Sequence, residues 1–131
     1  MSRKMLCVAF LTTVLGWMAQ RAGAVEWRRA AYWDGRYATQ WVGSGEAMRD
    51  ALAGAGYAIL NADELKSWMD DRIDDGAMSV VVFCRDVVPD TITESRSADC
   101  TLRQYLDAGG KIVWYGELPF YYQGHADGTT T

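Results

Sequence analysis

The sequence predicts an α/β fold: a three-layer α/β/α sandwich built on a parallel sheet, with about four strands and three helices. Short apolar runs alternate with segments whose apolar residues recur at helical spacing, and glycines separate the two kinds of segment. One run, Val80–Phe83, is apolar at every position, which is typical of a strand buried on both faces between helix layers. Parallel strands that are joined by helices produce such a sandwich.

The first predicted strand and helix follow residues 1–24. An apolar run opens at residues 25–27 and ends at residues 30–33, and a polar, glycine-bearing loop covers residues 34–43. The Ser44 hydroxyl is expected to cap the next helix by accepting an unpaired backbone N–H. Gly54 and Gly56 mark the end of that helix. Its apolar residues are Ala47, Met48, Ala51, Leu52 and Ala55.

A second strand, residues 57–60, leads into a helix that begins after Asn61. Asn61 and Glu64 have the spacing of a capping box, in which each side chain accepts a backbone N–H of the other residue. The helix ends at Asp74-Asp75-Gly76. Its apolar face comprises Leu65, Trp68, Met69 and Ile73.

The third strand covers residues 78–84, and the polar segment 85–97 that follows has no regular pattern. Leu102, Tyr105 and Leu106 then define a third helix, which Gly109-Gly110 closes. A fourth strand follows at residues 111–115. The order along the chain is therefore strand and helix in strict alternation.

Residues 1–24 have the pattern of an export signal. Ser2-Arg3-Lys4 is basic, residues 5–19 carry no charge, and Ala22-Gly23-Ala24 offers small side chains before a cleavage site at Val25. A membrane anchor is the alternative, but a spanning helix needs about 20 apolar residues. We expect an exported protein, periplasmic or extracellular, with one domain at residues 25–123. Residues 124–131 are expected to be a polar tail or a truncated continuation, because four strands are few for a doubly wound sheet.

The charge balance excludes several classes of partner. Removing residues 1–24 leaves 10 basic and 17 acidic side chains. A surface this acidic disfavours nucleic acid and, after signal cleavage, a membrane, and it suits a small neutral ligand. With a single histidine, His125, and no Cys-x-x-Cys, a zinc site is not expected, and the acidic cluster at residues 70–75 lacks calcium-loop spacing. We expect no metal and no cofactor.

Two cysteines follow the expected cleavage site. Cys84 ends the third strand and Cys100 begins the third helix, so both are expected at the same edge of the sheet. A disulfide between them would close the loop that carries Arg85 and Asp86 and could stabilise the fold by about 3 kcal/mol. The alternative is two buried thiols. A nucleophilic role for Cys84 with His125 as its base is disfavoured, because the Gly-x-nucleophile-x-Gly pattern is missing.

Aromatic and carboxylate side chains follow the predicted strands. Ligands of open parallel sheets bind beyond the carboxyl ends of the strands, so these side chains should share one edge. Rings that pack on sugar C–H faces and carboxylates that accept from hydroxyls suit a carbohydrate; the alternative is aromatic rings that simply cover the core. The candidate ligand-binding residues are Asp34, Arg36, Tyr37, Trp41, Arg85, Asp86, Glu117 and Tyr121. The same ends carry Asn61, Asp63, Phe120, Tyr122 and Gln123.

The segment Leu102–Val113, with the order helix, Ala-Gly-Gly, strand, resembles the class I glutamine amidotransferase-like superfamily, in particular its trehalose-utilisation-like branch. Val80–Cys84 and the following loop with Asp86 resemble the preceding strand of that superfamily, and the likeness covers roughly residues 28–118. It implies a flavodoxin-like fold, a site at the carboxyl ends of the strands and a role in exported carbohydrate metabolism. The catalytic Cys, His and Glu of the superfamily match no position here, so the resemblance supplies no catalytic residue.

Three functions remain open from the sequence. The first is a non-catalytic amidotransferase-like module of an exported protein that binds carbohydrate or a downstream partner domain. The second is a hydrolase of sugar or amide substrates whose nucleophile lies beyond residue 131, with Asp34, Asp86 or Glu117 as acid or base. The third is a structural or oligomerisation domain with Trp33, Trp41 and Tyr121 as interface anchors.

Overall fold

The computed structural model describes residues 27–41, 43–116 and 118–131. The expected export signal and Glu117 therefore lie outside the described residues. The helices and strands are β1 (Arg28–Tyr32), α1 (Gly45–Gly54), β2 (Ala58–Leu60), α2 (Ala62–Asp75), β3 (Ser79–Phe83), β4 (Val88–Pro89), α3 (Asp90–Thr93), α4 (Thr101–Asp107), β5 (Lys111–Trp114) and β6 (Gln123–Gly124).

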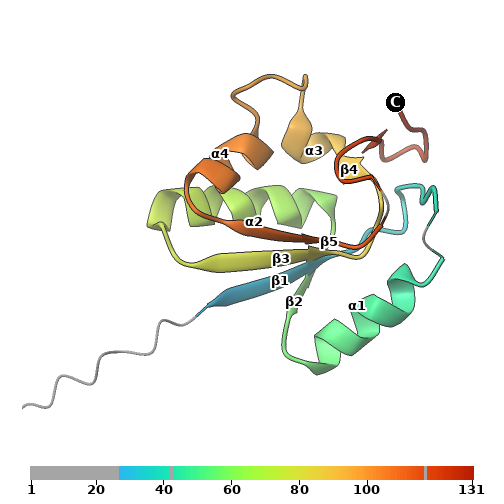
Figure 1. Ribbon diagram of the computed structural model, residues 1–131, viewed down its shortest axis with the longest axis horizontal. Coiled ribbons are helices and arrows are strands. Elements are labelled where there is room, and N and C mark those ends of the chain that lie inside the picture. The colour runs from blue at the N-terminus through green and yellow to red at the C-terminus, as the bar shows by residue number, and fades with distance from the viewer. Residues whose placement is uncertain (1–26, 42, 117) are drawn as a thin grey trace, which may run out of the picture.

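Strands β1, β2, β3 and β5 form one parallel sheet in the order β2-β1-β3-β5. Helix α1 covers one face, and α2, α3 and α4 lie on the other (Figure 1). This is the flavodoxin-like three-layer α/β/α sandwich that the sequence predicts. None of the helices among residues 27–41, 43–116 and 118–131 has both the length and the apolar character to span a membrane.

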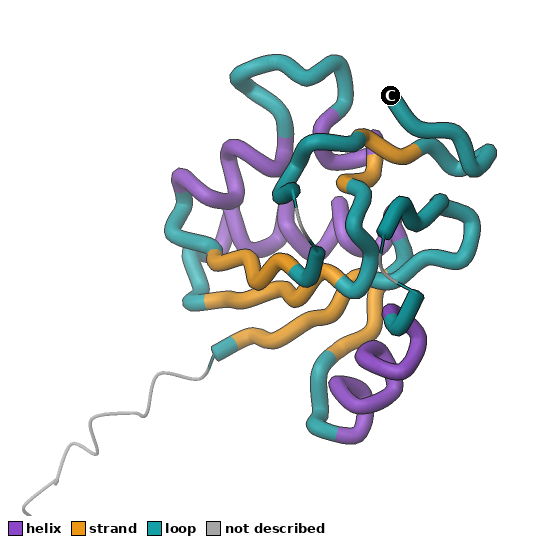
Figure 2. The backbone as a smooth tube through the Cα atoms, turned by 45° about the vertical axis from the view of Figure 1, so that its right-hand side comes forward, coloured by secondary structure: helices purple, strands orange, loops and turns teal. Residues whose placement is uncertain are grey.

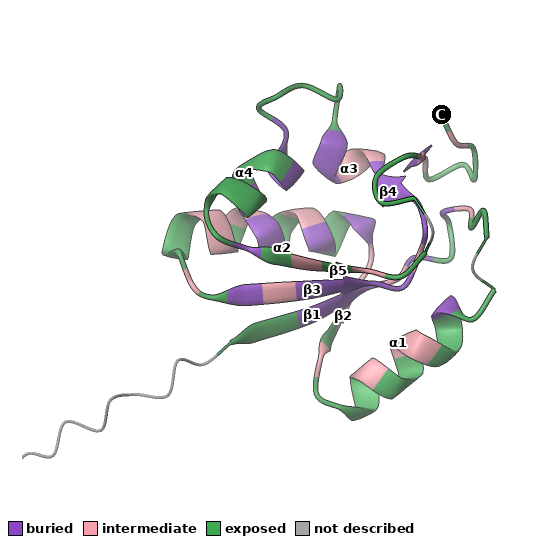
Figure 3. Ribbon diagram, in the orientation of Figure 1, coloured by how far each residue is buried: buried purple, intermediate pink, exposed green. Residues whose placement is uncertain are grey.

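The two faces of the sheet carry different halves of the core. Side chains alternate along a strand, so Tyr32 and Phe83 pack toward α2 and α4, whereas Ala31 and Val82 pack toward α1. The carboxyl half of β1 and almost all of β3 are buried, as expected for strands with neighbours on both sides (Figure 3). The continuous apolar run in β3 is explained by burial on both faces.

The capping box at the start of α2 is confirmed. The Asn61 side chain accepts hydrogen bonds from the N–H groups of Asp63 and Glu64, and Glu64 accepts from the Asn61 N–H at 2.9 Å. Gly76 ends the helix in the left-handed conformation, with φ of 61°. The expected cap on α1 is wrong, because the Ser44 hydroxyl lies 2.8 Å from the Tyr115 hydroxyl and caps no backbone group.

Two glycines allow close packing. A Cβ at Gly45, the first residue of α1, would lie 2.1 Å from the Cys84 carbonyl oxygen, so this end of α1 rests directly on the backbone that follows β3. A Cβ at Gly110 would lie 2.3 Å from the Tyr105 ring. Gly109 has φ of 94°, which explains the first glycine of the Gly109-Gly110 pair.

The segment after β3 is more regular than its sequence indicates. Within residues 85–97 it forms the short strand β4 and the short helix α3, and β4 pairs in parallel with β6. Residues 124–131, expected to be a tail or a continuation, fold back on β6. Thr131 and Gln123 exchange two backbone hydrogen bonds of 2.9 Å, and Arg96 donates to the Thr131 carbonyl oxygen at 2.7 Å.

Candidate ligand-binding rim

The carboxyl ends of the four parallel strands meet at one edge of the sheet. In register, Tyr32 of β1 lies opposite Leu60 and Phe83, and Phe83 lies opposite Trp114. The loops that follow β1, β3 and β5 therefore begin side by side and gather at the same end of the molecule (Figure 2). The structure thus brings Asp34, Arg36, Tyr37, Trp41, Arg85, Asp86 and Tyr121 to one end of the sheet.

Asp34 is buried, at 5% exposure, and fully engaged. Its carboxylate accepts hydrogen bonds from Arg36, with the shortest, from Nη2, at 2.7 Å, and from the Ala62 N–H at 3.1 Å. Arg36 also donates to Asp63 at 2.9 Å. Burial alone would raise the pKa of Asp34, but the hydrogen bonds from Arg36 and Ala62 lower it to about 2. The carboxylate is therefore ionised at neutral pH and is a poor proton donor.

Asp86 organises the loop after β1. Its carboxylate accepts from the backbone N–H of Gln40 at 2.9 Å and from the backbone N–H of Trp41. The loop after β5 touches it too, because a Cβ at Gly116 would lie 3.0 Å from the Asp86 Cβ. Asp86, which is itself buried, thus connects the three loops and fixes the position of Trp41.

Arg85 and Trp33 form a contact at the same end. The Arg85 guanidinium carbon lies 5.0 Å from the centre of a Trp33 ring, and Nε donates to the Asp34 carbonyl oxygen at 3.1 Å. The Arg49 guanidinium lies over Trp33 as well, at 4.2 Å. Trp33 is therefore half-buried, with two guanidinium groups against its rings.

Tyr37 takes part in a hydrogen-bonded group that the sequence does not predict. Its hydroxyl donates to Asp90 at 2.9 Å, and His125 Nδ1 lies 2.8 Å from the other Asp90 oxygen. Burial, followed by the hydrogen bond to Asp90, raises the pKa of Tyr37 well above its usual range. Asp90 opens α3 and His125 follows β6, so this group joins the loop after β1 to the small second sheet. No periodic signal in the sequence indicates that contact.

Aromatic side chains remain exposed around these paired charges. We call Trp41, Tyr115, Phe120 and Tyr121 the aromatic rim. Trp41 and Tyr121 are 62% and 63% exposed, while Phe120 packs one side of its ring on Trp114, with centroids 5.0 Å apart. The Ser44–Tyr115 hydrogen bond links the loop of Trp41 to the loop of Tyr121. Tyr115, Phe120 and Tyr121 thus contact neighbouring side chains, while Trp41 and Tyr121 remain more than half exposed.

The described residues contain no cluster of side chains that could hold a metal ion. Among residues 27–41, 43–116 and 118–131, no group of three or more His, Cys, Asp or Glu side chains is arranged to hold a metal ion. Asp34, Asp63 and Asp86 instead accept from arginine and backbone donors.

The predicted disulfide between Cys84 and Cys100 is wrong. Both thiols are free and buried. Cys84 shares the side-chain orientation of Val82 and packs on the α1 side of the sheet, whereas Cys100 packs with Leu102 and Tyr105 on the other side. The sheet itself separates the two sulfur atoms. Burial raises the pKa of Cys84 to about 11, so this thiol is not a nucleophile at neutral pH.

Comparison with known proteins identifies a family. The chain is 32% identical to a protein of Methanocaldococcus jannaschii named "Uncharacterized protein MJECL34", over 111 aligned residues. The alignment covers 80% of this chain and 37% of the relative, so the chain spans little more than a third of that protein. No solved structure matches the chain. Residues 28–131 match the MJECL34 family, and this range contains every described strand and helix. The chain belongs to the MJECL34 family.

Proposed function

We propose that the chain is a non-catalytic, glutamine amidotransferase-like module of an exported protein, and that its aromatic rim binds a small neutral ligand such as a sugar. A partner domain that covers the same rim is the competing occupant. The argument combines the state of the buried carboxylates with the exposure of the aromatic rings.

The engaged carboxylates argue against catalysis. A general acid or base needs a pKa near the working pH and a free path to the substrate proton. Asp34 has a pKa of about 2 and accepts from Arg36 and Ala62, and Asp86 accepts from two backbone N–H groups. These side chains hold loops together. The buried Cys84 thiol, with its raised pKa, is equally unsuited to attack a substrate.

The exposure of Trp41 and Tyr121 is the observation that carries the proposal. Each residue leaves more than half of its surface in water, at the edge of a parallel sheet where ligands usually bind. Asp86 fixes the Trp41 backbone, and the Tyr121 ring packs against that of Tyr122 with centroids 4.8 Å apart, so the loops present both residues before a ligand arrives. Flat rings of this kind pack well on the C–H faces of sugars.

A glycan array followed by calorimetry tests the proposal. The full chain should bind at least one neutral glycan, and Trp41→Ala or Tyr121→Ala should weaken binding about tenfold or more, as expected for an aromatic anchor. Trp27→Ala is the matched control, because Trp27 is also exposed but precedes the amino end of β1. If no neutral sugar binds at millimolar concentration, the ligand proposal is wrong. A monomer–dimer equilibrium that depends on Trp41 would favour an oligomerisation domain instead.

A further inference from the structure

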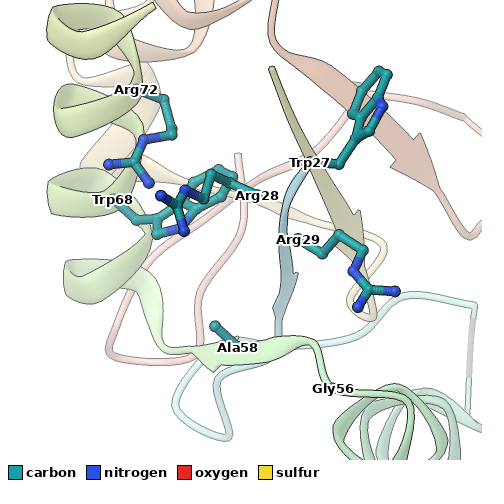
Figure 4. Close-up of a pocket in the computed structure, with 7 residues that line it drawn as sticks. All are labelled: Trp27, Arg28, Arg29, Gly56, Ala58, Trp68 and Arg72. Carbon is teal, nitrogen blue, oxygen red and sulfur yellow. The ribbon is translucent and has the colours of Figure 1, made fainter. Parts of the chain in front are cut away.

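A cavity lies at the opposite end of the sheet from the aromatic rim. It has a volume of about 360 Å³ and opens beside the amino end of β1 (Figure 4). Ala58 begins β2 opposite Ala30, so β2 offers no paired residue to the first two residues of β1, and Gly56 has no side chain to fill the gap. The cavity is lined by Trp27, Arg28, Arg29, Gly56, Ala58, Trp68 and Arg72.

Arginine dominates the charge of this cavity. Three of its lining residues are arginines and none is acidic, although the chain as a whole has a formal net charge of −4. Arg28 lies on the face of the sheet that α2 covers, because it alternates in phase with Ala30 and Tyr32. Arg29 extends toward the other side, beside Gly56, and its guanidinium carbon lies 5.1 Å from the Tyr57 ring centre (Figure 4).

Arg72 of α2 has an unsatisfied hydrogen-bond donor at this wall. Its Nη2 pairs with Asp75 at 2.7 Å, and its guanidinium carbon lies 5.7 Å from the centre of a Trp68 ring. Its Nε is buried and has no acceptor among the described residues. A buried donor without an acceptor costs free energy, so an oxygen that entered beside Trp68 would be stabilised by this N–H.

We propose that this cavity binds an oxyanion, a phosphate or carboxylate group, through Arg28 and Arg72. Guanidinium groups match the geometry of both oxyanions and donate charge-assisted hydrogen bonds. The cavity is also large enough for a ring attached to the anion. The site is separate from the aromatic rim and requires neither sugar binding nor export.

NMR titration of the full chain tests the site. The Nε–H signals of the arginines and the indole N–H signals of the tryptophans are followed while inorganic phosphate, phenyl phosphate or benzoate replaces chloride at constant ionic strength. Saturable shifts at Arg72 and Trp68 are expected with phosphate. Tighter binding of phenyl phosphate than of phosphate identifies a ligand with a ring, and a response to benzoate extends the site to carboxylates.

Matched variants separate the site from general surface charge. Arg72→Lys keeps the charge but removes the Nε–H, and it should weaken binding about tenfold. Arg28→Lys, in β1, should also weaken binding about tenfold. This second variant keeps the test valid if Arg72→Lys unfolds the chain. The control is Arg103→Lys, because Arg103 makes a comparable intrahelical ion pair with Asp107 outside the cavity.

The proposal is overturned if phosphate causes no saturable shift at tens of millimolar, or if Arg103→Lys weakens binding as much as Arg72→Lys. Shifts confined to Trp41 would also contradict it. A sugar-binding failure at the aromatic rim leaves these signals unaffected, so the two proposals fail independently.

Discussion

The carboxylate of Asp34 accepts a hydrogen bond from the backbone N–H of Ala62, so the loop after β1 is tied to the first residue of α2. The bond is 3.1 Å long and buried. It satisfies one of the N–H groups that a helix leaves unpaired at its start, and the negative charge lies at the favourable end of the helix dipole. Asp34 at the sheet edge therefore acts as a structural acceptor, and Arg36 holds it in place.

Replacing Asp34 by Asn should destabilise the protein by about 1–3 kcal/mol at pH 7, because the charge-assisted bonds are lost. The effect should depend on pH. The folded-state pKa of about 2 lies below the usual value of 3.8, so the stabilisation is present above about pH 4 and disappears as the pH falls toward 2. With partial screening by solvent around Arg36, the pH-dependent part is about 1–2 kcal/mol.

Urea unfolding at several pH values between 7 and 2 measures this difference. Asp50→Asn is the control, because Asp50 makes an exposed ion pair with Arg49 and should change stability by less than about 1 kcal/mol. A gap between wild type and Asp34→Asn that stays constant down to pH 2 would show that the lowered pKa of Asp34 does not stabilise the fold.

Gly45→Ala should destabilise the protein by about 1–3 kcal/mol, since the new Cβ would collide with the Cys84 carbonyl oxygen. Gly54→Ala, in the same helix, is the matched control. Among the described residues, no atom beyond the neighbouring backbone of α1 lies within 4 Å of a Cβ built at Gly54, so this change should be neutral or slightly stabilising. Thermal unfolding of the two variants measures both effects. Equal melting temperatures would mean that the start of α1 does not rest on the Cys84 backbone as described.

Replacing Cys7, which lies in the expected export signal, by Ser leaves Cys84 and Cys100 as the two cysteines of the chain. Both thiols should react only after unfolding. At pH 8 the native protein should gain no iodoacetamide adduct within minutes, because burial raises the pKa of Cys84 to about 11 and Cys100 is also buried. In guanidinium chloride without reductant, mass spectrometry should find two adducts. A mass two hydrogens lower with no adducts would instead identify a Cys84–Cys100 disulfide.

The expected export signal predicts a new N-terminus. The full chain produced in a bacterial host should be recovered outside the cytoplasm and begin at Val25, because small residues precede this position. Ala24→Arg should block cleavage by placing a large charged side chain at the site. Recovery of the uncut chain in the membrane fraction would favour the anchor, and recovery in the cytoplasm would contradict export.

The sheet and the helices could be predicted because their signals are local. Val80–Phe83 is apolar at every position, and Asn61 and Glu64 have capping-box spacing, so periodicity and a single hydrogen-bond motif suffice. The register of the strands then follows from the burial of their apolar side chains. This register places the residues after β1, β3 and β5 at one end of the sheet, as the sequence predicts.

The contacts of individual side chains depended on distant parts of the chain. The Ser44 hydroxyl contacts the Tyr115 hydroxyl, and Asp90 joins Tyr37 to His125. These residues lie far apart in the sequence, so no local pattern predicts their contacts. The Cys84–Cys100 prediction failed for a reason that the sequence does contain. Alternation along the strand places Cys84 in phase with Val82 and out of phase with Phe83, on the face that lacks Cys100.

The most direct test of the aromatic rim is an NMR titration of the tryptophan indole N–H signals with a neutral sugar that binds on the array. The account predicts a saturable shift at Trp41 and no change at Trp68, which lines the arginine-rich cavity at the opposite end of the sheet. Saturable binding that shifts Trp68 and leaves Trp41 unchanged would contradict it.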